Sequence, residues 1–175
     1  SEMGAPIHCA KKNRDYGEFT PLRIIGRTIG QLFDTGKLSS LINTLKVAVL
    51  NAVSNSINRE KGTIVMRGVE LTDLLRPGKE HKVVVVGAFH TYISKIVASG
   101  RPLRVLELNP DAMLPEHMQY FSPAHEFPRV LSDAGIVIIT GLTIVNNTFD
   151  ELLQACPADA QIAVIGPSSN LIADV

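Results

Sequence analysis

The stretch His81–Pro110, HKVVVVGAFHTYISKIVASGRPLRVLELNP, decides the fold. It holds a continuous β-branched run that ends at Gly87, then a segment with apolar residues at helical spacing, then a second apolar run. An apolar run without alternation is typical of a parallel strand that is covered on both faces. Strand, helix and strand at this spacing predict a βαβ unit with a right-handed crossover.

The same alternation continues to the end of the chain. A Pro-rich connection over 109–135 leads to a third apolar run at Ile136–Gly141, a helix over Val145–Pro157 that an Asn or Thr would cap, and a fourth run at Ala160–Pro167. The sequence therefore predicts an α/β fold with a Rossmann-like parallel sheet. Its strands, numbered along the chain, take the order 2-1-3-4, and a crevice opens where the order reverses between strands 1 and 3.

The part before this sheet follows a different pattern. Pro-Gly and charged residues in LLRPGKEHK, Leu74–Lys82, predict a loop that divides the chain. We expect residues 1–78 to form a smaller, mainly helical N-terminal lobe and residues 79–175 to form the Rossmann-like domain. Leu38–Asn58 has the spacing of an amphipathic or wholly buried helix. Gly62–Gly68, GTIVMRG, fits a short strand or an extended arm.

Composition narrows the partners and the compartment. The formal net charge of the 175 residues is zero, which argues against a nucleic-acid partner, and no apolar run approaches the ~20 residues that span a bilayer. The chain begins without an apolar signal segment, and its two cysteines lie far apart. Two lone thiols fit a reducing compartment, so we expect a cytoplasmic protein without a membrane partner. A homodimer is compatible with this composition.

Small and polar residues follow the first two strands. The candidate ligand-binding residues at these strand ends are Gly87, Ala88, Phe89, His90, Glu107 and Asn109. A dinucleotide fingerprint needs G-x-G-x-x-G, whereas Phe89 and Tyr92 stand where its second and third glycines would be. We therefore expect a ligand smaller than a dinucleotide. Glu107 occupies the position of an acid that contacts a ribose, and the alternative is an ordinary turn with a solvated carboxylate.

The ends of the third and fourth strands carry a denser group of hydroxyls and amides. The candidates here are Thr140, Gly141, Thr143, Asn146, Gly166 and Ser168. Free N–H groups at a strand-to-helix turn, together with such side chains, can hold an anion or a carboxylate. Helix capping is the alternative, although it accounts for only one or two of these residues.

The candidate metal ligands, His8 and Cys9, lie near the start of the chain. An imidazole and a thiolate suit a soft metal, so a divalent metal is the candidate cofactor. Adjacent residues rarely hold one metal without help from elsewhere in the fold. A solvated basic loop is therefore the alternative for this stretch.

Several segments together resemble a known family, described as "putative heavy-metal chelation" proteins. They are KVVVVGAFH, RVLELNP, SDAGIVIITGLTIVNNTFDELLQAC and AQIAVIGPSSNL, with LKVAVLNAVSN ahead of them. The resemblance implies an enolase-N-terminal-like lobe before a Rossmann-like lobe, with the active site suggested in the cleft between them. The residues that it points to as cleft residues are Gly87, Glu107, Asn109, Thr140, Gly141, Thr143, Asn146 and Gly166.

These observations favour a binding function over a defined reaction. We expect the interlobe cleft to bind, with or without chemical processing, a small anionic ligand, a metal or a metal complex. One alternative is an enzyme that uses an adenosyl cofactor or a nucleotide, such as a methyltransferase-like protein with Glu107 on the ribose. A purely structural module is the other. No catalytic residue is assigned, because no paired carboxylates, Ser-His-Asp set or activated cysteine stands out.

Overall fold

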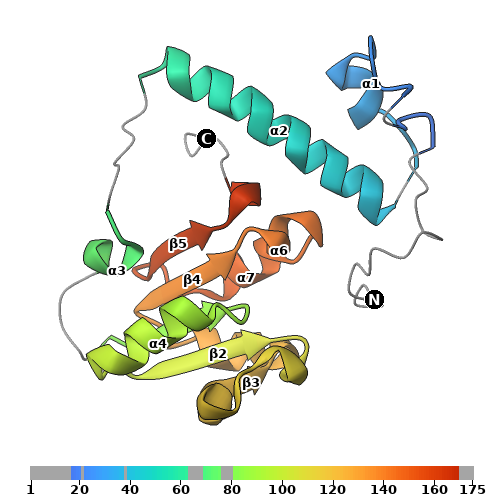
Figure 1. Cartoon of the computed structure of the whole chain (residues 1–175). Coiled ribbons are helices and arrows are strands. Elements are labelled where there is room, and N and C mark those ends of the chain that lie inside the picture. The colour runs from blue at the N-terminus through green and yellow to red at the C-terminus, as the bar shows by residue number, and fades with distance from the viewer. Residues whose placement is uncertain (1–16, 21, 38, 63–68, 76–80, 170–175) are drawn as a thin grey trace.

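The computed structural model describes residues 17–20, 22–37, 39–62, 69–75 and 81–169. Five parallel strands form its core, in the order β3-β2-β1-β4-β5 (Figure 1). Their bounds are Val83–Val86 for β1, Leu103–Glu107 for β2, Phe121–Pro123 for β3, Ile136–Thr140 for β4 and Gln161–Ile165 for β5. The α/β class and the order of the four predicted strands are confirmed, since these strands are β1, β2, β4 and β5.

The predicted order lacks β3, a three-residue strand that adds to the β2 edge of the sheet. β3 lies in the Pro-rich connection between two 3₁₀ helices, Pro115–Tyr120 (η3) and Ala124–Glu126 (η4). So short a strand carries no periodic pattern, and it ends on Pro123, a residue that sequence reasoning places outside central strands. Its position at the edge explains why a proline is tolerated there.

Helices cover both faces of the sheet, which explains the unbroken apolar runs. α4, His90–Ser99, buries Ile93 and Ile96 against one face. α5, Phe127–Leu131, and α7, Phe149–Ala155, cover the other face together. Alternate valines of β1 point to opposite clusters, so every one of them is buried. The connections from β1 and β4 thus leave on opposite faces, as a doubly wound sheet requires.

Further short helices connect these elements. Their bounds are Leu142–Val145 for α6, Pro110–Ala112 for η2 and Pro167–Ser169 for η5. The predicted helix over 145–157 corresponds to α7, which is shorter and begins at Phe149, and its first residue, Val145, ends α6 instead. Thr148 stands at its N-cap but makes no side-chain cap hydrogen bond. α4 ends at Gly100 in the left-handed conformation (φ 72°), as a C-terminal glycine favours.

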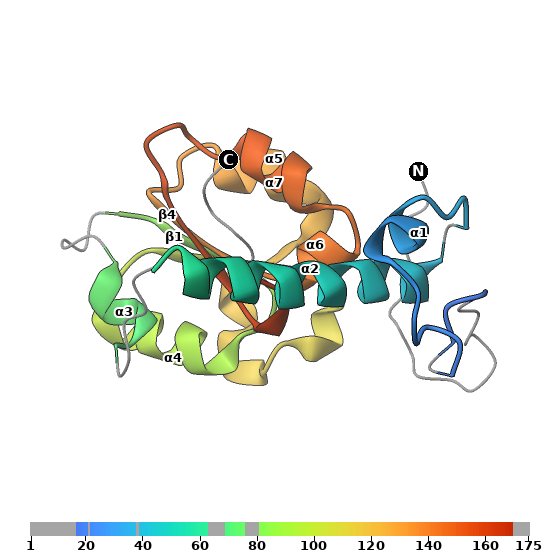
Figure 2. The same ribbon diagram turned by 90° about the horizontal axis from the view of Figure 1, so that it is seen from above.

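The regular structure among the described N-terminal residues is helical. α1 spans Ile29–Phe33, α2 spans Ser40–Glu60 and α3 spans Leu71–Leu74. α2 contacts α1 at one end, and it contacts α6 and η5 beside the sheet. Figures 1 and 2 together show α2 along the β5 edge, between the layers of α4 and of α5 and α7.

α2 is only partly buried, so the option of a wholly buried helix is wrong. The segment 63–68 of the expected strand or arm lies outside the described residues. No helix in the described part of the chain is both long and apolar enough to cross a membrane.

Candidate ligand-binding site

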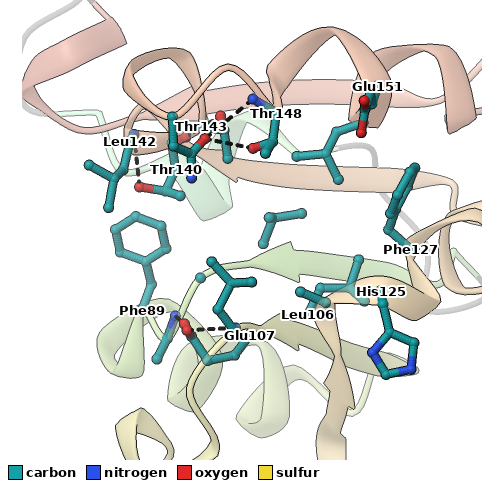
Figure 3. A pocket seen from close by; sticks show the side chains of 17 residues that line it. Phe89, Leu106, Glu107, His125, Phe127, Thr140, Leu142, Thr143, Thr148 and Glu151 are labelled. Carbon is teal, nitrogen blue, oxygen red and sulfur yellow. Dashed lines mark hydrogen bonds between the residues drawn. The ribbon is translucent and has the colours of Figure 1, made fainter. Parts of the chain in front are cut away.

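A cavity of about 530 Å³ opens at the carboxyl ends of β1, β2 and β4, on the side covered by α5 and α7 (Figure 3). This is the point where the strand order reverses. The lining residues are Val86, Gly87, Ala88, Phe89, Leu106, Glu107, Leu108, Ala124, His125, Phe127, Thr140, Leu142, Thr143, Asn146, Thr148, Glu151 and Leu152. All of them lie between Val86 and Leu152, within the predicted Rossmann-like domain, whereas the sequence predicted a ligand between two lobes. α2, from the predicted N-terminal lobe, reaches this region through its contact with α6.

The turn after β1 forms the floor of one end of the cavity. Gly87 has φ 107°, a conformation that side chains rarely adopt, and its N–H donates to the Leu106 carbonyl at 2.9 Å. A Cβ at this position would lie 3.4 Å from both Phe89 Cε2 and Thr140 Cγ2. Glycine therefore allows the ends of β1 and β4 to approach each other.

A single carboxylate holds this turn against the end of β2. Glu107 Oε2 accepts the Ala88 N–H at 2.9 Å, and its Oε1 accepts the N–H groups of Leu108 and Asn109 at 2.8 and 3.0 Å. These three bonds occupy most of the lone pairs of the carboxylate. Glu107 is thus a positioning residue for two turns and retains little capacity for a ligand.

Hydroxyls and amides gather after β4, where the sequence predicted them. Thr143 is buried, and its hydroxyl donates to the Thr140 carbonyl at 2.7 Å. Asn146 Oδ1 accepts both the N–H of Thr148 (3.3 Å) and its hydroxyl (2.7 Å). Thr140 Oγ1 accepts the Leu142 N–H at 3.3 Å. The hydroxyl proton of Thr140 and the Asn146 Nδ2 group thus have no partner of their own among the described residues, and both residues line the cavity.

Seven of the twelve predicted ligand-binding residues line this cavity. They are Gly87, Ala88, Phe89, Glu107, Thr140, Thr143 and Asn146. Their common location follows from the parallel sheet, because the carboxyl ends of neighbouring strands meet at one edge. Their role in binding stays a prediction.

The other five lie nearby but do not line the cavity. Gly141, Gly166 and Ser168 lie together at the ends of β4 and β5, where a Cβ on Gly141 would stand 3.2 Å from Ser168 Cβ. Asn109 caps η2 by accepting the Asp111 N–H at 3.1 Å.

His90 begins α4, and its ring stacks on that of His117, with ring centroids 5.9 Å apart. The predicted metal ligands, His8 and Cys9, lie outside the described residues.

Sequence reasoning missed the far end of the cavity, which α5, α7 and η4 supply. Glu151, Phe127 and His125 lie there, opposite Phe89 and Leu142 (Figure 3). The only sequence signal was an acidic residue in the first turn of a helix, which ordinarily means a favourable interaction with the helix dipole. Nothing in the sequence places that turn over the sheet.

The described residues do not fit a metal ion that is held by protein side chains alone. Among them, no three His, Cys, Asp or Glu side chains converge on one point, and a stable site needs three or four such ligands. The Cys156 thiol donates to the Leu152 carbonyl at 3.2 Å, and partial burial raises its pKa above the ordinary value. Both effects favour the thiol over the thiolate form that binds metals.

The fold and the cavity define a class: a Rossmann-like α/β protein with a pocket at the switch point of its sheet. Within that class, the chain belongs to the DUF364 family, described as "Putative heavy-metal chelation", whose model matches residues 70–175. The family predicted from the sequence is therefore confirmed. No curated protein matches the chain.

Two solved structures share the fold. One is a protein with unknown function from Pyrococcus horikoshii, with a TM-score of 0.67 and 20% identity over 84% of this chain and 57% of that chain. The other, also of unknown function, is from Desulfitobacterium hafniense, with a TM-score of 0.62 and 24% identity over 87% of this chain and 56% of that chain. The chain thus spans little more than half the length of these relatives, and at this identity they inform on the fold alone.

Proposed function

We propose that this protein binds a small organic molecule, or a metal ion carried inside an organic complex, in the cavity at the ends of β1 and β4. One observation carries the proposal: a cavity of about 530 Å³ lies at the switch point, with apolar walls and a few convergent polar groups. Pockets for small ligands commonly have this size, lining and location.

The family description concerns heavy metals, and the described pocket lacks a set of protein ligands for one. A metal complex resolves this difference, because the organic part supplies the metal ligands and presents an apolar surface to the protein. Val86, Leu106 and Leu152 offer such a surface, while Thr140 and Asn146 offer hydrogen bonds. The protein then recognises the complex rather than the ion.

A thermal-shift and calorimetric titration tests the proposal. Its arms are Zn²⁺, Cu²⁺ and Ni²⁺ as free ions, the same ions in bipyridine complexes, and the adenosyl cofactor that the sequence raised as an alternative. We expect the complexes to raise the melting temperature. At a hundredfold excess over Kd, bound ligand should add about 2.7 kcal/mol to the free energy of unfolding. Free ions should raise it less.

The pocket is tested with a pair of matched variants. Ala88→Leu adds volume inside the cavity, and Ala98→Leu adds the same volume on the exposed side of α4. The shift should vanish in Ala88→Leu and persist in Ala98→Leu. Equal shifts in both variants, or no shift with any complex, would contradict the proposal, and a shift only with the adenosyl cofactor would favour the alternative.

A further inference from the structure

The charges around the cavity carry information about its ligand. Its charged or titratable lining groups are the carboxylates of Glu107 and Glu151 and the imidazole of His125, and the described lining contains no Lys or Arg. Three backbone N–H groups already stabilise the Glu107 carboxylate. No hydrogen bond or ion pair within the described part of the chain engages the Glu151 carboxylate, so its negative charge is available to a ligand.

An aromatic ring lies at the same end of the cavity. Phe127 in α5 and Glu151 in α7 both line it at the end opposite Phe89 (Figure 3), and α5 packs on α7. A positively charged nitrogen is attracted by the face of an aromatic ring and by a carboxylate. A ligand carboxylate or phosphate placed there would instead be repelled by the negative charge of Glu151.

We infer that the natural ligand is an organic cation, an inference that rests on the proposed function. Its positive charge lies at the Glu151–Phe127 end and its apolar body lies over Leu106 and Leu152. The apolar residues are fully or nearly buried in the sheet and α7, so they form a fixed surface. The hydroxyl of Thr140, on the Phe89 side of the cavity (Figure 3), suits an uncharged donor or acceptor. An organic cation carries the opposite charge to the small anionic ligand that the sequence analysis named among its candidates.

Three probes of similar shape test the sign of the charge: benzylammonium, benzyl alcohol and benzoate, titrated at low ionic strength with the backbone amides of Gly87 and Thr143 as reporters. We expect benzylammonium to bind about fivefold more tightly than benzyl alcohol, and benzoate to bind most weakly. The preference for the ammonium should shrink as salt is added, because exposed charges are screened.

Two variants assign the effect to one carboxylate. Glu151→Gln should weaken benzylammonium about fivefold and leave benzyl alcohol within about twofold of its wild-type affinity. Asp150→Asn is the matched control, since Asp150 is an exposed acid in the same helical turn and does not line the cavity; it should behave like the wild type.

Benzoate binding as tightly as benzylammonium, or an unchanged ammonium affinity in Glu151→Gln, would overturn the inference while leaving the pocket as a binding site. If none of the three probes shifts the Gly87 and Thr143 amides, the inference falls, and the titration with metal complexes decides the proposed function separately.

Discussion

At the end of β2 a single carboxylate, Glu107, accepts three backbone N–H groups from two different turns. Residues of those turns line one end of the cavity, so the hydrogen bonds of Glu107 help to fix the shape of the site. Hydrogen bonds to a charged acceptor are stronger than neutral ones, and a buried N–H left without an acceptor is costly.

Substitutions of Glu107 should therefore cost stability in steps. Glu107→Gln keeps an oxygen for Leu108 and Asn109 but faces the Ala88 N–H with an amide group, so we expect a loss of about 1–2 kcal/mol. Glu107→Ala should lose about 2–3 kcal/mol. Urea denaturation measures both. Equal losses in the two variants would show that the carboxylate bonds are not what holds the turns.

Substitution of Gly87 should affect both stability and binding. With φ at 107° and a Cβ that would meet Phe89 and Thr140, Gly87→Ala combines backbone strain with crowding. We expect the free energy of unfolding to fall by about 1–3 kcal/mol and ligand binding to weaken. Gly100→Ala, also at a positive φ but far from the cavity, is the control, because it should lose stability without losing binding. Binding lost equally in both variants would contradict a local role for Gly87.

Among the elements, the start of β1 is joined to the loop between α5 and β4 by an ion pair. Lys82 Nζ pairs with Asp133 and also donates to the Val130 carbonyl at 2.8 Å. The hydrogen bond from Lys82 holds the pKa of Asp133 below its ordinary value. Because the Asp133 side chain is 69% exposed, solvent screens the pair, and its worth is at most about 1 kcal/mol.

The pH dependence of this pair has a definite sign. A carboxylate whose pKa is lowered in the folded state stabilises the fold above its ordinary pKa, and this stabilisation disappears as the pH falls through the lowered value. Asp133→Asn should therefore cost about 0.5–1 kcal/mol at pH 6, and this cost should fall steadily as the pH is lowered from about 4 towards 2. Denaturation of the wild type and the variant across this range measures the difference. A cost that does not change with pH would mean that lost packing, rather than charge, explains it.

The helices and strands differ in how well the sequence predicted them. β1, β2, β4, β5 and α4 were predictable because their apolar patterns reflect burial. The strands are apolar runs covered on both faces of the sheet, whereas α4 has apolar residues at helical spacing on its one buried face. β3 was missed because three residues at a sheet edge leave no period. The cluster after β4 was found from residue types alone, whereas Glu151 and Phe127 were missed. Their place in the site depends on how α5 and α7 pack over the sheet, which no local pattern records.

At the scale of the whole molecule, the apolar cores differ greatly in size. The sheet and its helices bury two large clusters, whereas Phe19, Leu32 and Ile42 form a small separate cluster around α1 and the start of α2. Regions with few buried apolar contacts open at lower free energy than the main core. The division of the chain into 1–78 and 79–175 stays a prediction that this difference can test.

Hydrogen exchange followed by mass spectrometry gives that test. We expect amides of α1 to exchange at least about a hundredfold faster than those of β1 and β4, which corresponds to an opening free energy lower by about 2.7 kcal/mol or more. α2 should be intermediate, because one end packs on α1 and its later part lies beside the sheet. Uniform protection from α1 to β5 would mean that the chain opens as one cooperative unit.

A crystal structure soaked with benzylammonium tests most directly whether the ends of β1 and β4 form a ligand-binding hollow together. We predict electron density inside the space bounded by Gly87, Glu107 and Thr140, with the nitrogen at the Glu151 end. A hollow closed by the side chains of Phe89 and Leu142, with the probe bound only elsewhere on the surface, would contradict it.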